Sequence, residues 1–206
     1  MKVLLVDDHR LLADALSGLI EARFPACTVE HAASLAEALA RLDERTGLVL
    51  LDLGLPDASG LEAVQAVRAH APEVRIVVLS ADDRPETVQA AIELGASGFV
   101  PKQADSRLLI QALSATLQGG VTLPPTLLAT WPAATPEPAV ELTPRQLDVL
   151  RLLVEGQSNK LICRSLGLSE SSVKTHLEAV YRRLGVASRT QAVVAAARLG
   201  LKLNAP

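Results

Sequence analysis

Short apolar runs alternate with amphipathic segments over the first 118 residues. The runs are rich in aliphatic and β-branched residues, which favour strands, whereas the segments between them repeat apolar residues at helical spacing. The predicted strands cover residues 2–6, 28–32, 48–51, 75–79 and 98–100. The predicted helices cover residues 10–23, 34–44, 60–70, 85–94 and 105–118. The first, third and fourth strands are almost wholly apolar, as parallel strands covered on both faces are, so we predict a doubly wound α/β domain with a five-stranded parallel sheet.

A second pattern, helical throughout, follows from residue 142. The segment Thr143-Pro144-Arg145-Gln146 has the form of a capping box with proline at the first helical position. The helix that it opens runs to about Glu155, and three more are predicted at 158–166, 169–184 and 189–199. Gly167 turns the chain between the second and third of these helices, which is typical of a helix-turn-helix. We therefore predict a small all-α domain of four helices.

A proline-rich stretch separates the two patterns. Five prolines fall within residues 124–138, and the stretch has no helical or strand periodicity. Proline-rich chains are semi-extended spacers. We therefore divide the chain into a first domain at 1–118, a linker at 119–141 and a second domain at 142–206.

Composition narrows the class of protein. Of the 206 residues, 49% are apolar, which is ample for buried cores and too many for a disordered chain. The longest apolar stretches fall well short of the roughly 18 residues that a membrane helix needs. The chain turns acidic at Asp7, too soon for a signal peptide. The two cysteines, Cys27 and Cys163, are too few for a metal cluster, and we expect buried free thiols in a reducing cytoplasm.

The net charge of −3 conceals an asymmetry. Residues 1–118 carry 10 Lys and Arg against 17 Asp and Glu, a formal charge of −7. Residues 142–206 carry 10 basic and 4 acidic residues, a formal charge of +6. An acidic half followed by a basic half indicates two domains with different partners, and the basic half is suited to a polyanion.

Polar side chains that can bind ligands or react follow the strands of the predicted sheet. The first strand ends at Asp7 and Asp8, the third at Asp52 and the fourth at Ser80, and Lys102 follows the fifth. Ligands of open α/β sheets bind at the carboxyl ends of the strands, so we expect these side chains in one cleft. Three carboxylates there repel one another, and Mg²⁺ relieves that repulsion. A lysine and a hydroxyl beside them suit a phosphoryl group, and a carboxylate can attack phosphorus to form an aspartyl phosphate.

Four segments resemble the receiver domain of two-component response regulators. They are Leu5-Val6-Asp7-Asp8-His9, Leu51-Asp52-Leu53-Gly54-Leu55-Pro56-Asp57-Ala58-Ser59-Gly60, Val78-Leu79-Ser80-Ala81 and Gly95-Ala96-Ser97-Gly98-Phe99-Val100-Pro101-Lys102. The resemblance implies a flavodoxin-like receiver whose Asp52 accepts a phosphoryl group from a sensor histidine kinase. It also implies a Mg²⁺ ion held directly by Asp8, largely through water by Asp7, by Asp52 itself and by the carbonyl of Gly54.

The same resemblance assigns roles after phosphorylation. It implies that Lys102 pairs with the phosphoryl oxygens, that Ser80 bonds to one of them, and that Phe99 turns inward as Ser80 moves. His9 borders the pocket, and we expect it to cap the following helix or to lie at the pocket rim. Asp82 is expected to begin the next loop, outside the metal site.

The helix predicted at 169–184 has two faces. An apolar stripe at helical spacing faces the domain core and consists of Val173, Leu177, Val180 and Leu184. Polar side chains opposite the stripe, near the start of such a helix, can reach base edges in a major groove. This polar set consists of Ser171, Lys174, Thr175, Glu178 and Arg182.

Nearly all of residues 142–200 closely resembles the LuxR-type helix-turn-helix. The segments that carry it are Leu142-Thr143-Pro144-Arg145-Gln146, Gly156-Gln157-Ser158-Asn159-Lys160-Leu161-Ile162, Leu166-Gly167-Leu168-Ser169, Val173-Lys174-Thr175-His176-Leu177, Leu184-Gly185-Val186 and Arg189-Thr190-Gln191-Ala192. The resemblance implies that 169–184 is a recognition helix with Lys174 and Thr175 toward the bases. It also makes the helix from Arg189 a candidate dimer contact on DNA, with two half-sites about one helical turn apart.

Four further positions complete the predicted DNA surface. Lys160, Arg182 and Arg183 are placed geometrically as contacts to DNA phosphates. Glu178 occupies a position where some relatives carry a basic residue, and it either accepts from a cytosine amine or weakens binding.

The two resemblances, in this order, are those of NarL/FixJ-type response regulators. The prediction is a cytoplasmic transcription factor that binds double-stranded DNA, is controlled by phosphorylation of Asp52, is a homodimer when active, and is not a turnover enzyme. One alternative is a phosphorelay or protein-interaction adaptor whose second domain no longer reads DNA. A haloacid-type phosphatase shares the aspartyl-phosphate chemistry but needs a second Asp two residues after its nucleophile, which Asp7-Asp8 does not provide.

Overall fold

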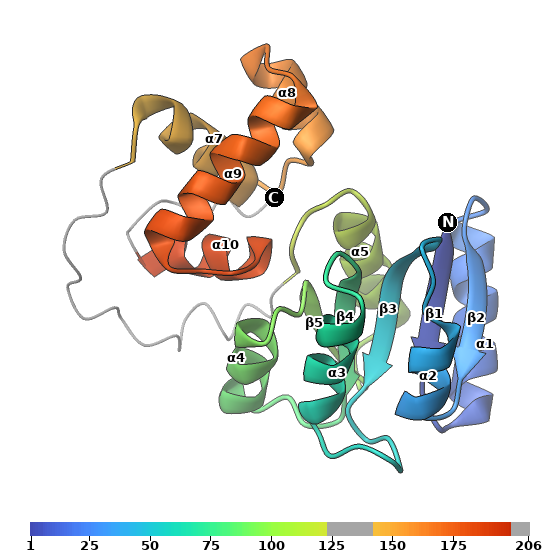
Figure 1. Ribbon diagram of the computed structural model, residues 1–206. Coiled ribbons are helices and arrows are strands. Elements are labelled where there is room, and N and C mark those ends of the chain that lie inside the picture. The colour runs from blue at the N-terminus through green and yellow to red at the C-terminus, as the bar shows by residue number, and fades with distance from the viewer. Residues whose placement is uncertain (123–141, 199–206) are drawn as a thin grey trace.

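The computed structural model of the protein describes residues 1–122 and 142–198, the first range as a sheet flanked by helices and the second as helices alone (Figure 1). The strands are β1 (Lys2–Val6), β2 (Thr28–Ala32), β3 (Thr46–Asp52), β4 (Arg75–Ser80) and β5 (Gly98–Pro101). The helices of the first range are α1 (Arg10–Arg23), α2 (Leu35–Arg41), α3 (Glu62–His70), α4 (Pro85–Glu93) and α5 (Ser106–Leu117). Those of the second range are α7 (Pro144–Val154), α8 (Asn159–Leu166), α9 (Glu170–Leu184) and α10 (Arg189–Arg198).

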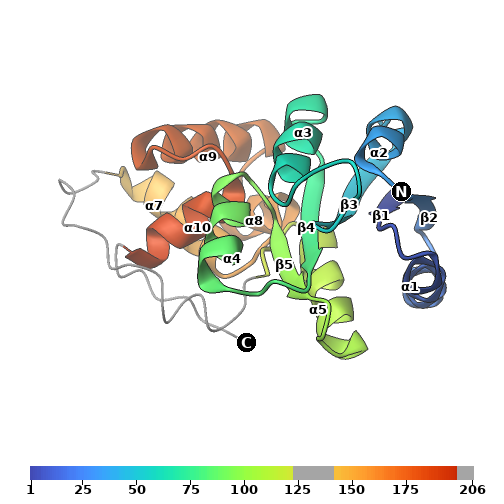
Figure 2. The same ribbon diagram turned by 90° about the horizontal axis from the view of Figure 1, so that it is seen from below.

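The sheet is parallel throughout, with strand order β2-β1-β3-β4-β5. Strand β1 is buried along its whole length, and β3 and β4 are buried along most of theirs, because helices cover both faces. In Figure 2, α1 and α5 lie on one face of the sheet and α2, α3 and α4 lie on the other. The predicted doubly wound α/β architecture is confirmed.

Each face of the sheet carries its own apolar cluster. Along β1, Leu4 and Val6 join the cluster under α2, α3 and α4, whereas Val3 and Leu5 join the cluster under α1 and α5. This alternation follows from the two-residue period of a strand. Because both faces are packed with aliphatic side chains, the polar residues of β1, β3 and β4 are confined to the strand ends.

Helix α2 is shorter than the sequence pattern predicts. It ends at Arg41 instead of residue 44, and β3 begins early, at Thr46. Between them Asp43 accepts hydrogen bonds from Arg45 N and Thr46 Oγ1, both at 3.0 Å, and these bonds close a tight turn. The hydrogen bond from Lys2 is the main reason that the pKa of Asp43 lies below its usual value, so the turn is also fastened to β1.

Caps set the limits of the helices in the second domain. The predicted capping box is present: Gln146 N donates to Thr143 Oγ1 at 3.3 Å, and Thr143 N donates to Gln146 Oε1 at 3.0 Å. Helices α8 and α9 each end at a glycine in the left-handed conformation, Gly167 with φ 62° and Gly185 with φ 65°. Helices α7 to α10 enclose a third apolar cluster, as a helix-turn-helix domain requires.

The first residues of the predicted linker belong to the sheet domain. Thr122 bridges to Gly98 of β5, and Phe99 N donates to Thr122 O at 3.2 Å. The remainder of the predicted linker, 123–141, and the chain from Leu199, at the predicted end of the last helix, lie outside the described residues.

The two cysteines differ from the expectation of full burial. Both are free thiols, but Cys27 is only half-buried at the edge of the cluster under α1 and α5, and Cys163 is half-buried beside the third cluster. Among the helices that the structure describes, none combines the length and the apolar character needed to span a membrane.

Candidate functional site

The sheet order brings the strand-end side chains together. Strands β1, β3, β4 and β5 are neighbours, so Asp7, Asp52, Ser80 and Lys102 meet at one edge of the sheet. Lys102 Nζ lies 2.7 Å from Asp52 Oδ2 and 2.9 Å from Asp7 Oδ2. The Asp7 side chain is 0% exposed, and that of Asp52 is 4% exposed. Two buried carboxylates thus share one ammonium group.

Lys102 supplies the positive charge of this pocket. Burial by itself lowers the pKa of Lys102, but the hydrogen bonds to Asp52 and Asp7 and the charges of both carboxylates outweigh that effect, so the pKa is raised above its ordinary value. The ammonium therefore remains charged at neutral pH. It offsets the cost of burying two carboxylates that water cannot reach.

Asp8 and His9 lie at the outer rim of the pocket. Asp7, Asp8, His9 and Asp52 each offer one ligand atom, and these atoms all lie within 4.8 Å of one another. His9 occupies the N-cap position of α1, but its side chain makes no capping hydrogen bond. Its Nδ1 lies 2.7 Å from Asp8 Oδ1 and 3.2 Å from Asp7 Oδ1. Of the two positions expected for the imidazole, the rim is therefore the one that it takes.

The pocket has the donors of a site for a hard divalent cation. Asp7 Oδ2 is fully buried, and its cation partner is the Lys102 ammonium, 2.9 Å away, which Asp52 shares. Two buried carboxylates paired with one ammonium leave a net negative charge, which a divalent cation would compensate. Carboxylate oxygens are the ligands that Mg²⁺ prefers.

The loop after β3 approaches the Asp52 carboxylate closely. A Cβ atom at Gly54 would lie 3.3 Å from Asp52 Oδ2, so a glycine lets the loop backbone come near. Farther along the loop, Asp57 accepts hydrogen bonds from Leu35 N at 2.8 Å and Ala36 N at 2.9 Å, at the start of α2. The bonds from Ala36 and Leu35 lower the pKa of Asp57. They fasten the loop that carries Gly54.

Two contacts that position the pocket residues, one made by Asp57 and one by His31, are not predictable from the sequence. The partners of Asp57 lie 21 and 22 positions away in the chain. His31, on β2, places its Nε2 2.7 Å from the carbonyl oxygen of Asp7. Both contacts depend on which strands and loops are neighbours, and the only local signal is a polar residue near an expected strand end.

A cleft of about 720 Å³ opens beside Asp52. Ser80 and Lys102 line it together with Asp52, and Gly54 and His9 also belong to its lining. Ser80 Oγ is nearly buried and accepts a hydrogen bond from Asp82 N at 3.0 Å. The strand-end hydroxyl is thus beside the carboxylate and is held by the following loop.

Asp82 belongs to that loop and not to the metal group. Its carboxylate accepts hydrogen bonds from Arg84 Nη2 at 2.7 Å and from Thr87 Oγ1 at 2.9 Å. The bond from Arg84 is the largest reason that the pKa of Asp82 is lowered, followed by the bond from Thr87. The expectation that Asp82 begins the next loop is met.

Phe99 is buried in the first domain. Its side chain is 1% exposed and belongs to the cluster under α2, α3 and α4. The resemblance implies that this ring turns inward as Ser80 moves. In this structure the ring lies in the core on β5, which pairs with β4, and the coupled movement stays a prediction.

Helix α9 places the predicted polar set on its outer face. Val173, Leu177 and Val180 are buried in the third cluster, as the apolar stripe predicts. The exposed side chains include Lys174, Thr175, Glu178, Arg182 and Arg183 on α9 and Lys160 on α8. Thr175 Oγ1 donates to Ser171 O at 3.1 Å, so its hydroxyl is at present bonded to its own helix.

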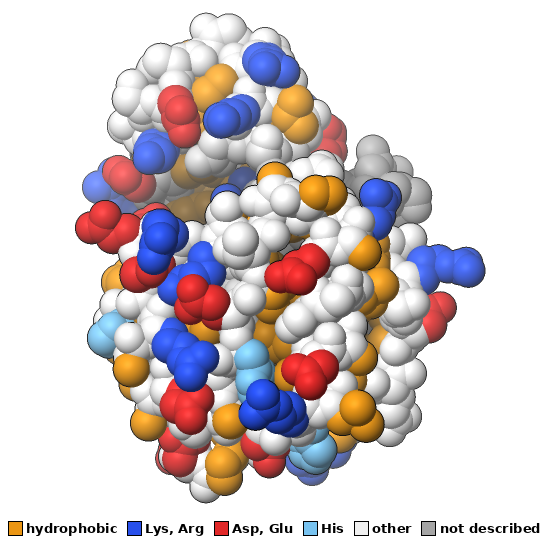
Figure 3. Space-filling view, turned by 90° about the vertical axis from the view of Figure 1, so that its right-hand side faces the viewer, with side chains coloured by type: hydrophobic (Ala, Val, Ile, Leu, Met, Phe, Trp, Pro, Cys, Tyr) orange, Lys and Arg blue, Asp and Glu red, His pale blue; other side chains and the backbone are white. Residues whose placement is uncertain are grey.

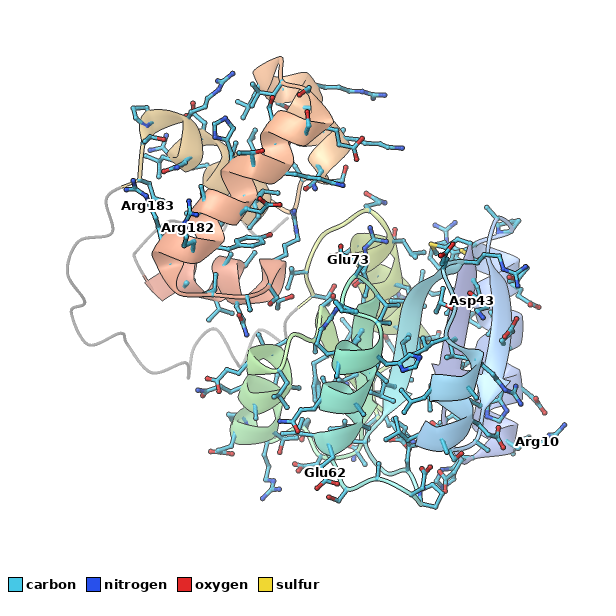
Figure 4. All side chains as sticks on the ribbon, viewed as in Figure 1. Arg10, Asp43, Glu62, Glu73, Arg182 and Arg183 are labelled. Atoms are coloured by element: carbon cyan, nitrogen blue, oxygen red, sulfur yellow. The ribbon has the colours of Figure 1, made fainter. Side chains whose placement is uncertain are left out.

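Part of this polar face lies toward the first domain. A cleft of about 840 Å³ between the domains is lined by Lys160 and Lys174 on one side and by Arg75 and Glu93 on the other. Arg182 and Arg183, at the end of α9, lie on the side of the second domain away from the sheet (Figure 4). The predicted DNA surface is therefore divided between the cleft and the outside of the molecule.

Helix α10 makes direct contacts with the first domain. Gln191 Nε2 donates to the carbonyl oxygen of Glu93 at the end of α4, and Val194 joins the apolar cluster under α2, α3 and α4. Over the first domain, acidic and basic side chains are interspersed on the face shown in Figure 3. The acidic excess of this domain therefore does not form one continuous patch on that face.

Two family models match the chain. The model for the response regulator receiver domain matches residues 3–114, and the model for bacterial regulatory proteins of the luxR family matches residues 140–196. The glycerol metabolism activator of Pseudomonas putida is 34% identical over 208 residues, which cover 95% of this chain and 94% of that protein. The nitrate/nitrite response regulator protein NarL of Escherichia coli strain K12 is 36% identical over 201 residues, 93% of each chain.

A solved structure with a similar fold covers most of this chain. It is that of RcsB from Salmonella enterica serovar Typhimurium, bound to promoter rprA in the presence of the phosphomimetic BeF3-. Its TM-score is 0.55 at 23% sequence identity, covering 97% of this chain and 99% of that one. At that identity the likeness concerns the fold alone.

Proposed function

The chain belongs to the bacterial response regulators that join a receiver domain to a LuxR-type DNA-binding domain, and from this premise we propose that a phosphoryl group on Asp52 controls its binding to DNA. A DNA-binding regulator of a two-component system is the function that the family matches show, and they do not favour an adaptor that has lost DNA binding. One observation carries the choice of Asp52. Of the three carboxylates in the pocket, Asp52 alone lines the open cleft, whereas Asp7 is fully buried.

The proposed reaction is a phosphoryl transfer onto a carboxylate. An oxygen of Asp52 forms a bond to phosphorus while the bond between phosphorus and the donor breaks, and the donor leaves with that electron pair. The donor is a phosphohistidine of a sensor histidine kinase, as the family implies. Lys102 already contacts Asp52 Oδ2, so its ammonium is positioned to pair with the new phosphoryl oxygens.

Mg²⁺ is the cofactor that receiver domains bind at an acidic cluster of this kind. We propose that Asp8, Asp7, Asp52 and the carbonyl of Gly54 hold it here. When bound, the ion neutralises negative charge on the phosphoryl oxygens. The carboxylate donor set, and the single Lys102 ammonium shared by the two buried carboxylates of Asp7 and Asp52, support this assignment.

Ser80 is proposed to couple the pocket to the surface. Its hydroxyl now accepts a hydrogen bond from Asp82 N, and bonding to a phosphoryl oxygen would turn it toward Asp52. That rotation releases Asp82 N and with it the loop that leads into α4. Helix α4 ends at Glu93, whose carbonyl holds Gln191 of the second domain, so a continuous path joins the phosphorylated residue to the domain contact.

Helix α9 is proposed to read DNA. Lys174, Thr175 and Glu178 would face base edges. Lys160, Arg182 and Arg183 would contact phosphates. Lys160 and Lys174 are exposed, but they line the cleft between the domains, so the first domain lies next to this part of the proposed DNA surface. We therefore propose that DNA binding, in the cytoplasm where DNA is available, follows separation of the domains and formation of a homodimer.

The test compares full-length wild-type protein with Asp52→Asn and with Asp83→Asn. Asp83 is exposed in the same region and lies outside the pocket, so it serves as the matched control. Each protein is incubated with Mg²⁺ and a small-molecule phosphodonor, and intact mass, oligomeric state and DNA binding are measured on the same sample. We expect one added phosphoryl group and stronger dimer formation in the wild type and in Asp83→Asn. Asp52→Asn should show neither, and an equal mass increase in that variant would refute the assignment.

A further inference from the structure

One nitrogen ligand lies among the oxygens of the proposed metal site. The His9 imidazole is the only nitrogen ligand in the metal-ligand group, whose other members are Asp7, Asp8 and Asp52. It is also 69% exposed, so the ring is accessible to ions from solvent. The side chain has no capping role in α1, and its Nδ1 contacts the carboxylates of Asp7 and Asp8 instead.

The oxygens of Asp7 and Asp8 are divided between two sides of the pocket. Asp7 Oδ2 faces the Lys102 ammonium, 2.9 Å away, while Asp7 Oδ1 and Asp8 Oδ1 face His9 Nδ1 at 3.2 Å and 2.7 Å. The imidazole and Lys102 therefore do not compete for the same oxygen atoms. A cation on the His9 side would be approached by carboxylates and by the ring nitrogen together.

Asp7 Oδ2 is fully buried beside the Lys102 ammonium, which it shares with Asp52, so one positive charge serves two buried carboxylates. Asp7 Oδ2 marks the interior end of the site, and His9 marks the exposed end. A donor set of carboxylates and one imidazole suits Mn²⁺ and later first-row divalent ions, whereas Mg²⁺ takes oxygen ligands and keeps its waters.

We propose that His9 Nδ1 is a ligand for first-row transition-metal ions in this pocket, which therefore binds Mn²⁺ and Ni²⁺ through nitrogen as well as oxygen. The proposal rests on the proposed function in that it uses the same carboxylates. The site accepts Mg²⁺ without His9, and it binds a transition-metal ion with His9 in addition. His9 thus determines which ion occupies the pocket when both kinds are present.

Direct detection of the nitrogen is the deciding experiment. Full-length protein with Mn²⁺ is examined by electron spin echo envelope modulation, which reports ¹⁴N bound to the metal. Wild type should show imidazole ¹⁴N modulation, and His9→Asn should lose it. Asparagine is a favoured N-cap residue, so this variant keeps the start of α1 intact. His70→Asn removes an exposed histidine at the end of α3 and should keep the signal.

Calorimetric titration gives a second, independent measurement. Loss of a direct ligand should weaken Ni²⁺ binding by about tenfold or more in His9→Asn, because even supporting residues of metal sites contribute that much. The affinity for Mg²⁺ should change much less than the affinity for Ni²⁺, because Mg²⁺ takes oxygen ligands. Wild type without ¹⁴N modulation, a signal that survives in His9→Asn, or an equal loss of Mg²⁺ and Ni²⁺ affinity would each overturn the proposal.

Failure of this inference is distinguishable from failure of the proposed function. If Asp52 accepts the phosphoryl group in Mg²⁺ and no nitrogen binds Mn²⁺, the role of His9 is wrong and the function stands. If nitrogen binds Mn²⁺ and Asp52 takes no phosphoryl group, the function is wrong and the metal site stands.

Discussion

The strand-end pocket and the outer face of α9 both consist of charged residues, but they hold their charges in different ways. In the pocket, Asp7 and Asp52 are buried and share Lys102 as an internal partner. On α9, Lys174 and Glu178 are exposed on a helix whose opposite face is the domain core. The pocket charges are therefore part of the fold of their domain, whereas the α9 charges lie on the surface of theirs.

Removal of the shared cation from the pocket should give the largest change in stability. Lys102→Met leaves Asp7 and Asp52 buried without compensation, so we expect the free energy of unfolding to fall by about 3 kcal/mol in the absence of divalent cations. Added Mg²⁺ should restore part of the loss. Urea unfolding of the full chain measures it, and hydrogen exchange of the β1 and β3 amides assigns the transition to the first domain.

The matched control is a lysine on the other kind of surface. Lys160→Met changes an exposed side chain on α8, and the free energy of unfolding should stay within about 0.5 kcal/mol of the wild type. Equal stability losses in Lys102→Met and Lys160→Met would contradict the distinction between the two regions.

The reciprocal change on α9 should affect binding and not folding. Lys174→Ala in the phosphorylated protein should weaken binding to a DNA fragment selected by the wild type by about tenfold. The urea midpoint should be unchanged. Fluorescence anisotropy over a range of salt concentrations measures the affinity and its salt slope. Arg107→Ala removes an exposed cation from α5 and should leave both unaltered; unchanged binding in Lys174→Ala would exclude this residue from the DNA contact.

The smallest expected effect concerns acid sensitivity of the pocket loop. The folded protein lowers the pKa of Asp57 because Ala36 N and Leu35 N donate to it. A carboxyl whose pKa is lower in the folded state stabilises the fold at pH values above its unfolded-state pKa of about 3.9. That contribution disappears as the pH falls through the folded-state pKa. Wild type should therefore exceed Asp57→Asn in stability at pH 7, and the difference should narrow below about pH 4.

Unfolding followed at a series of pH values measures this difference. Asp83→Asn, an exposed neighbour of the pocket, is the control and should differ little from wild type at pH 7. A difference between wild type and Asp57→Asn that widens in acid would show that the carboxylate does not hold the loop.

The sequence predicts the residues of both regions, but not the strand order that brings the pocket residues together. The pocket residues are predictable because aliphatic runs define the strands and a polar residue after each run marks one edge of the sheet. The faces of α9 are predictable from the spacing of Val173, Leu177 and Val180. The strand order is not predictable from these patterns, because it depends on which strands each helical connection joins side by side.

The other features that the sequence does not predict are contacts between segments far apart in the chain. The sequence leaves open whether His9 caps α1 or faces the pocket, and the answer depends on the position of Asp8 Oδ1. Nothing local indicates that Gln191 reaches Glu93, 98 positions away. Phe99 is predictable as a core residue of a short strand, but its position relative to Ser80 depends on how β4 and β5 pair.

The bond between Gln191 and the carbonyl of Glu93 has a consequence for the evolution of the domain contact. Because the acceptor is a main-chain oxygen, any residue at position 93 can provide it, while position 191 must keep a donor. Substitutions at the two positions are therefore not expected to accompany each other among descendants of this chain. The same holds for His31 and the Asp7 carbonyl, so a statistical search for covarying positions would pass over both contacts.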